Sequence, residues 1–251
     1  MVLLSDLLRQ LLLAPEGTLF SSDSLKTMSE PMSPSVGLAV IHLFCTPGAN
    51  FDGEAVIGAV KTAEAAGVTV ISVSMLGHKA DCAFMALSSD MRELKALQTG
   101  LQHAGLTVID SYVSLTEVSE YADGVPEEMK NARLYPQLPP AGKNAWCFYP
   151  MSKRRDEGQN WFTLPFDQRR ELMHEHGVSG RKFSGRVIQV VTGSAGLDKY
   201  EWGVTLFAVN PDDLKEVVYT MRFDEASAVY ADFGDFYVGM VTPVDELVHQ
   251  I

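Results

Sequence analysis

The heptapeptide AWCFYPM, residues 145–151, decides the fold, because the order of the predicted elements starts again at this point. Before it, over residues 37–113, apolar β-type runs and amphipathic helical runs follow one another in the order β-α-β-β-α-β. From residue 145 to residue 241 the same order returns, without obvious sequence identity between the two copies. Two copies of this order predict two ferredoxin-like units and place the chain in the α+β class.

Each predicted unit has an antiparallel sheet with its helices on one face, so the other face of each sheet must be covered. We expect the two sheets to cover each other and to form a barrel-like interior. This arrangement divides the chain into four segments. They are a flexible leader (1–35), an N-terminal ferredoxin-like half (36–115), a connector (116–143) and a C-terminal ferredoxin-like half that carries the functional site (144–251).

The chain is acidic, with 32 Asp and Glu against 20 Lys and Arg, which gives a net charge of −12. This charge argues against nucleic acid and against an anionic membrane surface as partners, because phosphate binding needs a basic surface. Residues 3–13 are apolar but too short for a membrane span, and they indicate a short amphipathic helix. Cys45, Cys82 and Cys147 form no CxxC pattern, so we expect reduced thiols in a cytoplasmic protein.

A phenol, a thioether and an ammonium alternate along the strand predicted at residue 145 and beyond. Tyr149, Met151 and Lys153 occupy every second position, so their side chains point to one face of the sheet. Such a face offers a hydrogen-atom donor next to a cation. It therefore predicts a site for an anionic ligand.

A helix predicted over residues 166–176, ending at Gly177, carries two histidines. His174 and His176 are two residues apart and point about 200° apart on a helix, so both cannot bind one metal. His176 is either a metal ligand or a histidine that is stabilised at the helix end. No HExxH pattern accompanies it, and a single histidine ligand is what a haem iron takes.

Basic residues are scattered in the second half of the chain. Arg133 lies in the connector, Arg181 follows the histidine helix, and Arg222 ends the next predicted helix. Most such residues are surface charges in proteins. The alternative is that they converge on a ligand with several carboxylates.

Several segments together resemble the haem-dependent chlorite dismutase superfamily. They are YPMSKRR (149–155), HGVSGR (176–181), EWGVTLF (201–207) and MRFDEAS (221–227). Within the superfamily the chain resembles the peroxide-dependent coproheme decarboxylases, or haem b synthases, in their actinobacterial form. The resemblance covers roughly residues 36–241 and implies a dimeric-type α+β barrel, which agrees with the element order.

The resemblance also implies roles for individual residues. Tyr149 matches the catalytic tyrosine, His176 the proximal iron ligand, and Gln189 a distal position that holds arginine in chlorite-degrading relatives. Tyr200 matches an aromatic position beside the porphyrin. The positions that line the porphyrin propionates are matched by Arg133, Met151, Lys153, Arg181, Arg222 and Ser227.

The reaction implied by the resemblance uses Fe-coproporphyrin III (coproheme) as both substrate and redox centre. Hydrogen peroxide is the oxidant, a radical forms on Tyr149, and two propionates become vinyl groups, which gives haem b. The resemblance further implies a homo-oligomer with five subunits and a transient contact with coproporphyrin ferrochelatase.

Two alternatives remain open, a chlorite dismutase and a non-catalytic haem-binding or transfer protein. Gln189 in place of an arginine argues against the first. The chain also departs from the actinobacterial pattern, because no histidine lies between His103 and His174 to serve as a distal base.

Overall fold

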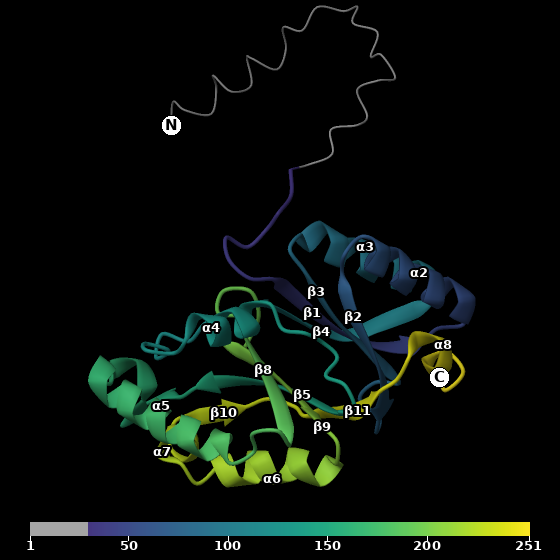
Figure 1. Ribbon diagram of the computed structural model, residues 1–251. Helices are drawn as coiled ribbons and strands as arrows, with labels where there is room; N and C mark the ends of the chain where they lie inside the picture. Colours follow the sequence, from purple (N-terminus) through teal and green to yellow (C-terminus); the bar gives the residue numbers. More distant parts are fainter. Residues whose placement is uncertain (1–29) are drawn as a thin grey trace, which may run out of the picture. The chain divides into compact units, whose positions relative to one another are not determined.

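The computed structural model describes residues 30–251 (Figure 1). The helix predicted over residues 3–13 lies outside this range, and the division into four segments stays a prediction. Within the described residues, no helix is long and apolar enough to cross a membrane. Residues 32–251 make one compact unit, so the two halves of the predicted duplication belong to a single body.

The first half shows the predicted order of elements. It contains β1 (Ala39–Pro47), α2 (Gly53–Ala65), β2 (Thr69–Leu76), β3 (Cys82–Ser88), α3 (Met91–His103) and β4 (Leu106–Thr116). Both helices begin at an aspartate whose carboxylate accepts a backbone N–H of the first turn, Asp52 for α2 and Asp90 for α3.

The second half repeats this order, which confirms the predicted pair of ferredoxin-like units. Its main elements are β5 (Ala145–Lys153), α5 (Phe166–Arg181), β8 (Val187–Gly193), β9 (Trp202–Ala208), α6 (Pro211–Met221), β10 (Ala231–Phe233) and β11 (Tyr237–Val241). Shorter elements lie between and after them: α4 (Glu127–Leu134), β6 (Arg155–Asp156), β7 (Gln159–Asn160), a 3₁₀ turn (Trp161–Thr163), α7 (Glu225–Ala228) and α8 (Val244–Leu247).

Two predicted elements were wrong in their bounds. Helix α5 does not end at Gly177 but continues through it to Arg181, because Gly177 keeps a negative φ instead of the left-handed conformation that ends a helix. The single strand expected before residue 241 is split into β10 and β11, and between them the N–H of Gly234 bonds the carbonyl of Pro150. The connector also contains a helix, α4.

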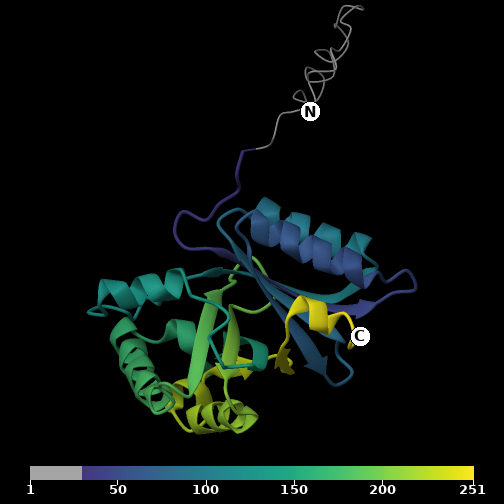
Figure 2. The ribbon, with the colours of Figure 1, turned by 45° about the vertical axis from the view of Figure 1, so that its right-hand side comes forward.

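The sheet closes into a barrel (Figure 2). Its strands follow the order β10-β5-β11-β2-β3-β1-β4-β8-β9, and β5 also pairs with β9. The pairing of β5 with β9 closes the ring of strands from β5 to β9. The short strand β10 lies outside this ring and pairs with the last residues of β5. Every pairing between these strands is antiparallel. Along each strand the side chains point alternately to the barrel interior and to the outer face, and residues paired across two strands share a face.

Aromatic side chains fill the interior of the barrel, which the two sheets enclose as predicted. Phe44, Trp146 and Phe148 are buried there. His42 lies among them with its ring 4.1 Å from that of Phe148, and its Nε2 bonds Thr205 Oγ1 at 2.9 Å. Burial lowers the pKa of His42 to about 3, so this histidine is a neutral part of the core.

Helices cover most of the outer face. Helices α2 and α3 pack on the first half, and Leu214 and Val217 of α6 pack on Val204 and Leu206 of β9. This cover does not extend over all of β8, where Gln189 and Val191 stay exposed. Part of the outer face of the barrel is therefore open beside α5.

Candidate active site

Tyr149 lies on the outer face of β5, under the helix layer. Its side chain is buried, and its ring stacks on Phe236 with centroids 4.5 Å apart and contacts Phe233 at 5.8 Å. Burial raises the pKa of Tyr149 well above its usual value, and the charge of Arg222 opposes this only in part. The phenol is therefore neutral and keeps its proton.

Lys153 shares this face and is buried as well. Its Nζ donates a 2.6 Å hydrogen bond to the carbonyl of Ala226 and lies 4.3 Å from the centre of the Trp161 ring. Burial lowers the pKa of Lys153 to about 8, opposed by the charges of Asp224 and Glu201. An ammonium has three donors, so the hydrogen bond to Ala226 leaves capacity for an anionic ligand.

His176 projects from α5 towards α7. Its Nδ1 lies 3.1 Å from both carboxylate oxygens of Asp224 and 3.4 Å from Ser227 Oγ. Since an ionised carboxylate only accepts hydrogen bonds, Nδ1 is the donor and Nε2 is the nitrogen that can bind a metal. His174 is exposed and lines a groove beside α6, so only His176 faces inward, as the spacing predicted.

The segment MRFDEAS, residues 221–227, connects these groups. The guanidinium of Arg222 lies 4.4 Å from the ring of Phe233, which also contacts Tyr149. Asp224 caps α7 by accepting the N–H of Ser227 at 3.1 Å while it holds His176. The sequence motif itself did not indicate that Asp224 is the partner of His176.

The remaining predicted residues lie on β8, on α4, at the end of α5 and between β8 and β9. Gln189 is on the outer face of β8, in register with Leu206, and is exposed. Arg133 lies in the last turn of α4 and Arg181 ends α5, both exposed. Tyr200 packs against the barrel-interior cluster and also lines an open pocket together with Lys153, so its place beside a porphyrin stays a prediction.

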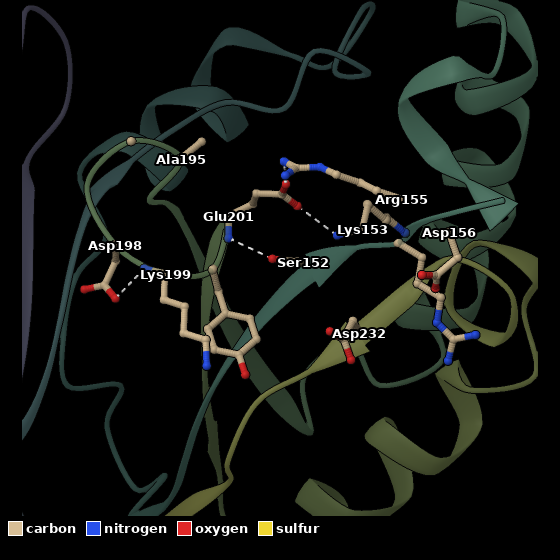
Figure 3. Close-up of a pocket in the computed structure, with 12 residues that line it drawn as sticks. Ser152, Lys153, Arg155, Asp156, Ala195, Asp198, Lys199, Glu201 and Asp232 are labelled. Carbon is tan, nitrogen blue, oxygen red and sulfur yellow. Dashed lines mark hydrogen bonds and ion pairs between the residues drawn. The ribbon is translucent and has the colours of Figure 1, made fainter.

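An open pocket of about 630 Å³ lies beside Lys153 and reaches the β8–β9 turn (Figure 3). Glu201 is one of the residues that line it: one carboxylate oxygen accepts the backbone N–H of Lys153 at 2.8 Å, and the other pairs with Arg155. Lys199 and Asp232 also line the pocket.

Glu201 fixes the end of β5 from which Lys153 projects, because it accepts the backbone N–H of Lys153. The position of Glu201 in the EWG motif did not reveal this role.

The described residues contain no group of three or more His, Cys, Asp and Glu side chains arranged to hold a metal. His176 would thus hold an iron as a single protein ligand, with the other ligands supplied by a macrocycle. Asp224 gives it the hydrogen-bonded partner that metal-binding histidines usually have. The residues present therefore fit an iron porphyrin.

The closed pair of ferredoxin-like units makes the protein a dimeric-type α+β barrel. Within that class, the chain belongs to the chlorite dismutase family, whose sequence profile matches residues 52–242.

Individual relatives are more specific. The chain is 45% identical to the coproheme decarboxylase of Staphylococcus carnosus over 186 residues, which cover 69% of this chain and 73% of the relative. It is 43% identical to the coproheme decarboxylase of Staphylococcus saprophyticus, with the same coverage. The actinobacterial form within the family stays a prediction.

Solved structures agree with the fold. A heme-binding protein from Thermus thermophilus superposes with a TM-score of 0.77 at 34% identity, covering 85% of this chain and 94% of that one. A mutant chlorite dismutase from Candidatus Nitrospira defluvii superposes with a TM-score of 0.69 at 18% identity, covering 86% and 96%. The second likeness concerns the fold alone.

Proposed function

We propose that this protein is a coproheme decarboxylase that uses hydrogen peroxide to convert two propionates of Fe-coproporphyrin III into vinyl groups, through a radical on Tyr149. Its relatives from two staphylococci carry the name coproheme decarboxylase. The structural observation that carries the proposal is the hydrogen bond from His176 Nδ1 to Asp224. Asp224 belongs to residues 221–227, and the carbonyl of Ala226 in the same segment accepts the hydrogen bond of the Lys153 ammonium. One face thus offers an iron ligand and a buried cation for a carboxylate.

His176 binds the iron of the substrate through Nε2. Its ring is a quarter exposed, whereas the Asp224 side chain is only 5% exposed, so the carboxylate is a fixed support and the imidazole is accessible. The hydrogen bond sets the tautomer and raises the basicity of the imidazole. Asp224 therefore orients the ligand before the substrate arrives.

Lys153, Arg222 and Ser227 bind propionates. Coproheme carries four carboxylates, and cationic donors form the strongest hydrogen bonds with such groups. The Lys153 ammonium exchanges its bond to Ala226 for a propionate, and the guanidinium of Arg222 is held on Phe233 beside Tyr149. Met151 lies between Tyr149 and Lys153 on the same strand face and packs against the porphyrin edge.

Tyr149 provides the reactive oxygen. Because its phenol is neutral, loss of an electron also releases its proton, and the phenoxyl radical then takes a hydrogen atom from the propionate. Each propionate loses carbon dioxide and two electrons. For each vinyl group formed, one propionate, one hydrogen peroxide and one proton give carbon dioxide and two waters.

The test adds ferric coproheme to the purified protein and titrates peroxide while the porphyrin mass is followed. Two successive losses, each of a carboxyl group plus a hydrogen, support the proposal. Tyr149→Phe should bind coproheme but yield neither loss, whereas Tyr219→Phe, which alters a tyrosine 64% exposed on α6, should behave as the wild type. Coproheme that keeps its mass in the wild type would refute the proposal.

The same experiment separates the alternatives. Binding without mass loss would favour a haem-binding or transfer protein, and oxygen release from added chlorite would favour a chlorite dismutase. A homopentamer, a contact with coproporphyrin ferrochelatase and a cytoplasmic location stay predictions from the resemblance.

A further inference from the structure

Glu117 borders the open part of the outer face. It follows β4, whose Leu115 pairs with Gly193 of β8, so the alternation along β4 directs Glu117 to the outer face. Its Oε2 occupies the space that a Cβ on Gly193 would fill, so the carboxylate rests on the backbone of β8. The absence of a side chain at Gly193 makes this position possible.

The carboxylate is fixed from one side. Trp202 Nε1 donates a 2.9 Å hydrogen bond to Glu117 Oε1. Trp202 pairs with Gly193 on one side and with Met151 on the other, so these three residues form one row across the outer face. The Glu117 carboxylate contacts this row, and Tyr149 and its partner Val204 belong to the next row. Among the described residues no donor bonds Oε2, which leaves this oxygen for a ligand.

The surroundings make Glu117 a stronger base than an ordinary surface glutamate. Although the residue as a whole is exposed, desolvation of its carboxyl raises its pKa, and the bond from Trp202 opposes this in part. The strands packed against it present Gly193 and Trp202, neither of which is charged. On its own segment, Glu120 is paired with Arg169 at 3.4 Å.

We propose that Glu117 is the base that accepts the proton of hydrogen peroxide on this face, an inference that rests on the proposed function. The proton moves from peroxide to Oε2, which gives a carboxylic acid and the hydroperoxide anion, the form that ferric iron binds. No electron moves in this step. His42 cannot serve, because it lies inside the barrel, on the other face of the sheet.

Two variants test the base. Glu117→Gln keeps an acceptor for Trp202 but cannot take a proton, and Gly193→Ala keeps the carboxylate but displaces it, because the new methyl group would overlap Oε2. Glu120→Gln removes a carboxylate from the same segment as a control. The rate at which peroxide changes the spectrum of the ferric coproheme complex is measured from pH 5 to 9, together with the rate of cyanide binding, which also requires loss of a proton.

In the wild type both rates should rise with pH and level off once Glu117 is ionised. Glu117→Gln and Gly193→Ala should lower both about tenfold or more and flatten the rise, since general-base catalysis typically contributes about 10²–10⁴-fold. Glu120→Gln should match the wild type.

Unchanged rates and pH profiles in Glu117→Gln would overturn the inference, and so would loss of coproheme binding, which would make Glu117 a binding group. If the wild type yields no vinyl product but its peroxide and cyanide rates still depend on Glu117, the proposed function fails and the inference stands. Normal decarboxylation with rates independent of Glu117 would instead overturn the inference and leave the proposed function standing.

Discussion

Replacing Lys153 with methionine should change how the free energy of unfolding depends on pH. Burial lowers the pKa of Lys153 from 10.5 to about 8 in the folded protein. At about 1.4 kcal/mol per pKa unit, this difference corresponds to about 3 kcal/mol of unfolding free energy. Lys153 is only 7% exposed, so solvent screening reduces this value little.

The sign follows from which state holds more protons. Below pH 8 both states are protonated, and the folded state bears the whole cost of burying the ammonium. Between pH 8 and 10.5 the folded protein releases the proton while the unfolded chain keeps it, so stability rises with pH in this window. Lys153→Met removes the titrating group. The wild type should therefore gain about 3 kcal/mol relative to the variant across the window.

Urea unfolding of both proteins at a series of pH values from 7 to 10.5 measures this difference. The variant also leaves the Ala226 carbonyl without its partner, at about 1–3 kcal/mol, and loses the contact with Trp161. The lost hydrogen bond shifts the difference without changing its slope, because a neutral amine also donates to the carbonyl. The cation–π contact requires the ammonium, so its loss acts only where Lys153 is protonated. Lys199→Met, at an exposed lysine, reports the effect of removing a surface charge. A wild-type-minus-Lys153→Met difference that stays flat from pH 7 to 10.5 would refute the reasoning.

Two further predictions concern the iron ligand and the barrel. Asp224→Asn should keep the cap of α7, since Asn caps helices as well as Asp does. It should weaken coproheme binding about 10–100-fold and alter the iron spectrum, because Asn is a poorer partner for the N–H of His176. An unchanged spectrum and affinity would contradict the role of Asp224. Gly239→Ala should cost about 1–3 kcal/mol in thermal unfolding, because its Cβ would overlap the backbone oxygen of Ser74. Gly58→Ala, in α2 with no atom within 4 Å, is its control and should stabilise by about 0.5–1 kcal/mol.

The periodic features of the sequence predicted the fold correctly. Alternation along residues 149–153 placed Tyr149 and Lys153 on one face, and helical geometry separated His174 from His176. These features depend on neighbours within one element, so they can be read from spacing alone. The repeated βαββαβ order also gave the paired sheets, because each needed a cover for its second face.

Features that depend on contacts between distant segments were not predictable in this way. The partners Asp224 and His176 are 48 residues apart in sequence, and Glu117 and Trp202 are 85 apart. Gly177 indicated a helix end, but glycine permits that conformation without requiring it. Tyr200 came from resemblance alone, and spacing gave no sign that it packs against the barrel-interior cluster while lining the pocket beside Lys153.

Residues 221–227 show why the site depends on two motifs that are far apart in the chain. Asp224 accepts the hydrogen bond of His176, and its charge also raises the pKa of Lys153 against the effect of burial. The carbonyl that holds the Lys153 ammonium belongs to Ala226, in the short helix that Asp224 caps. The support of the iron ligand and the support of the buried cation are thus the same helix turn. If coproheme spans His176 and Lys153 as proposed, a change at Asp224 must act on both ends of the ligand.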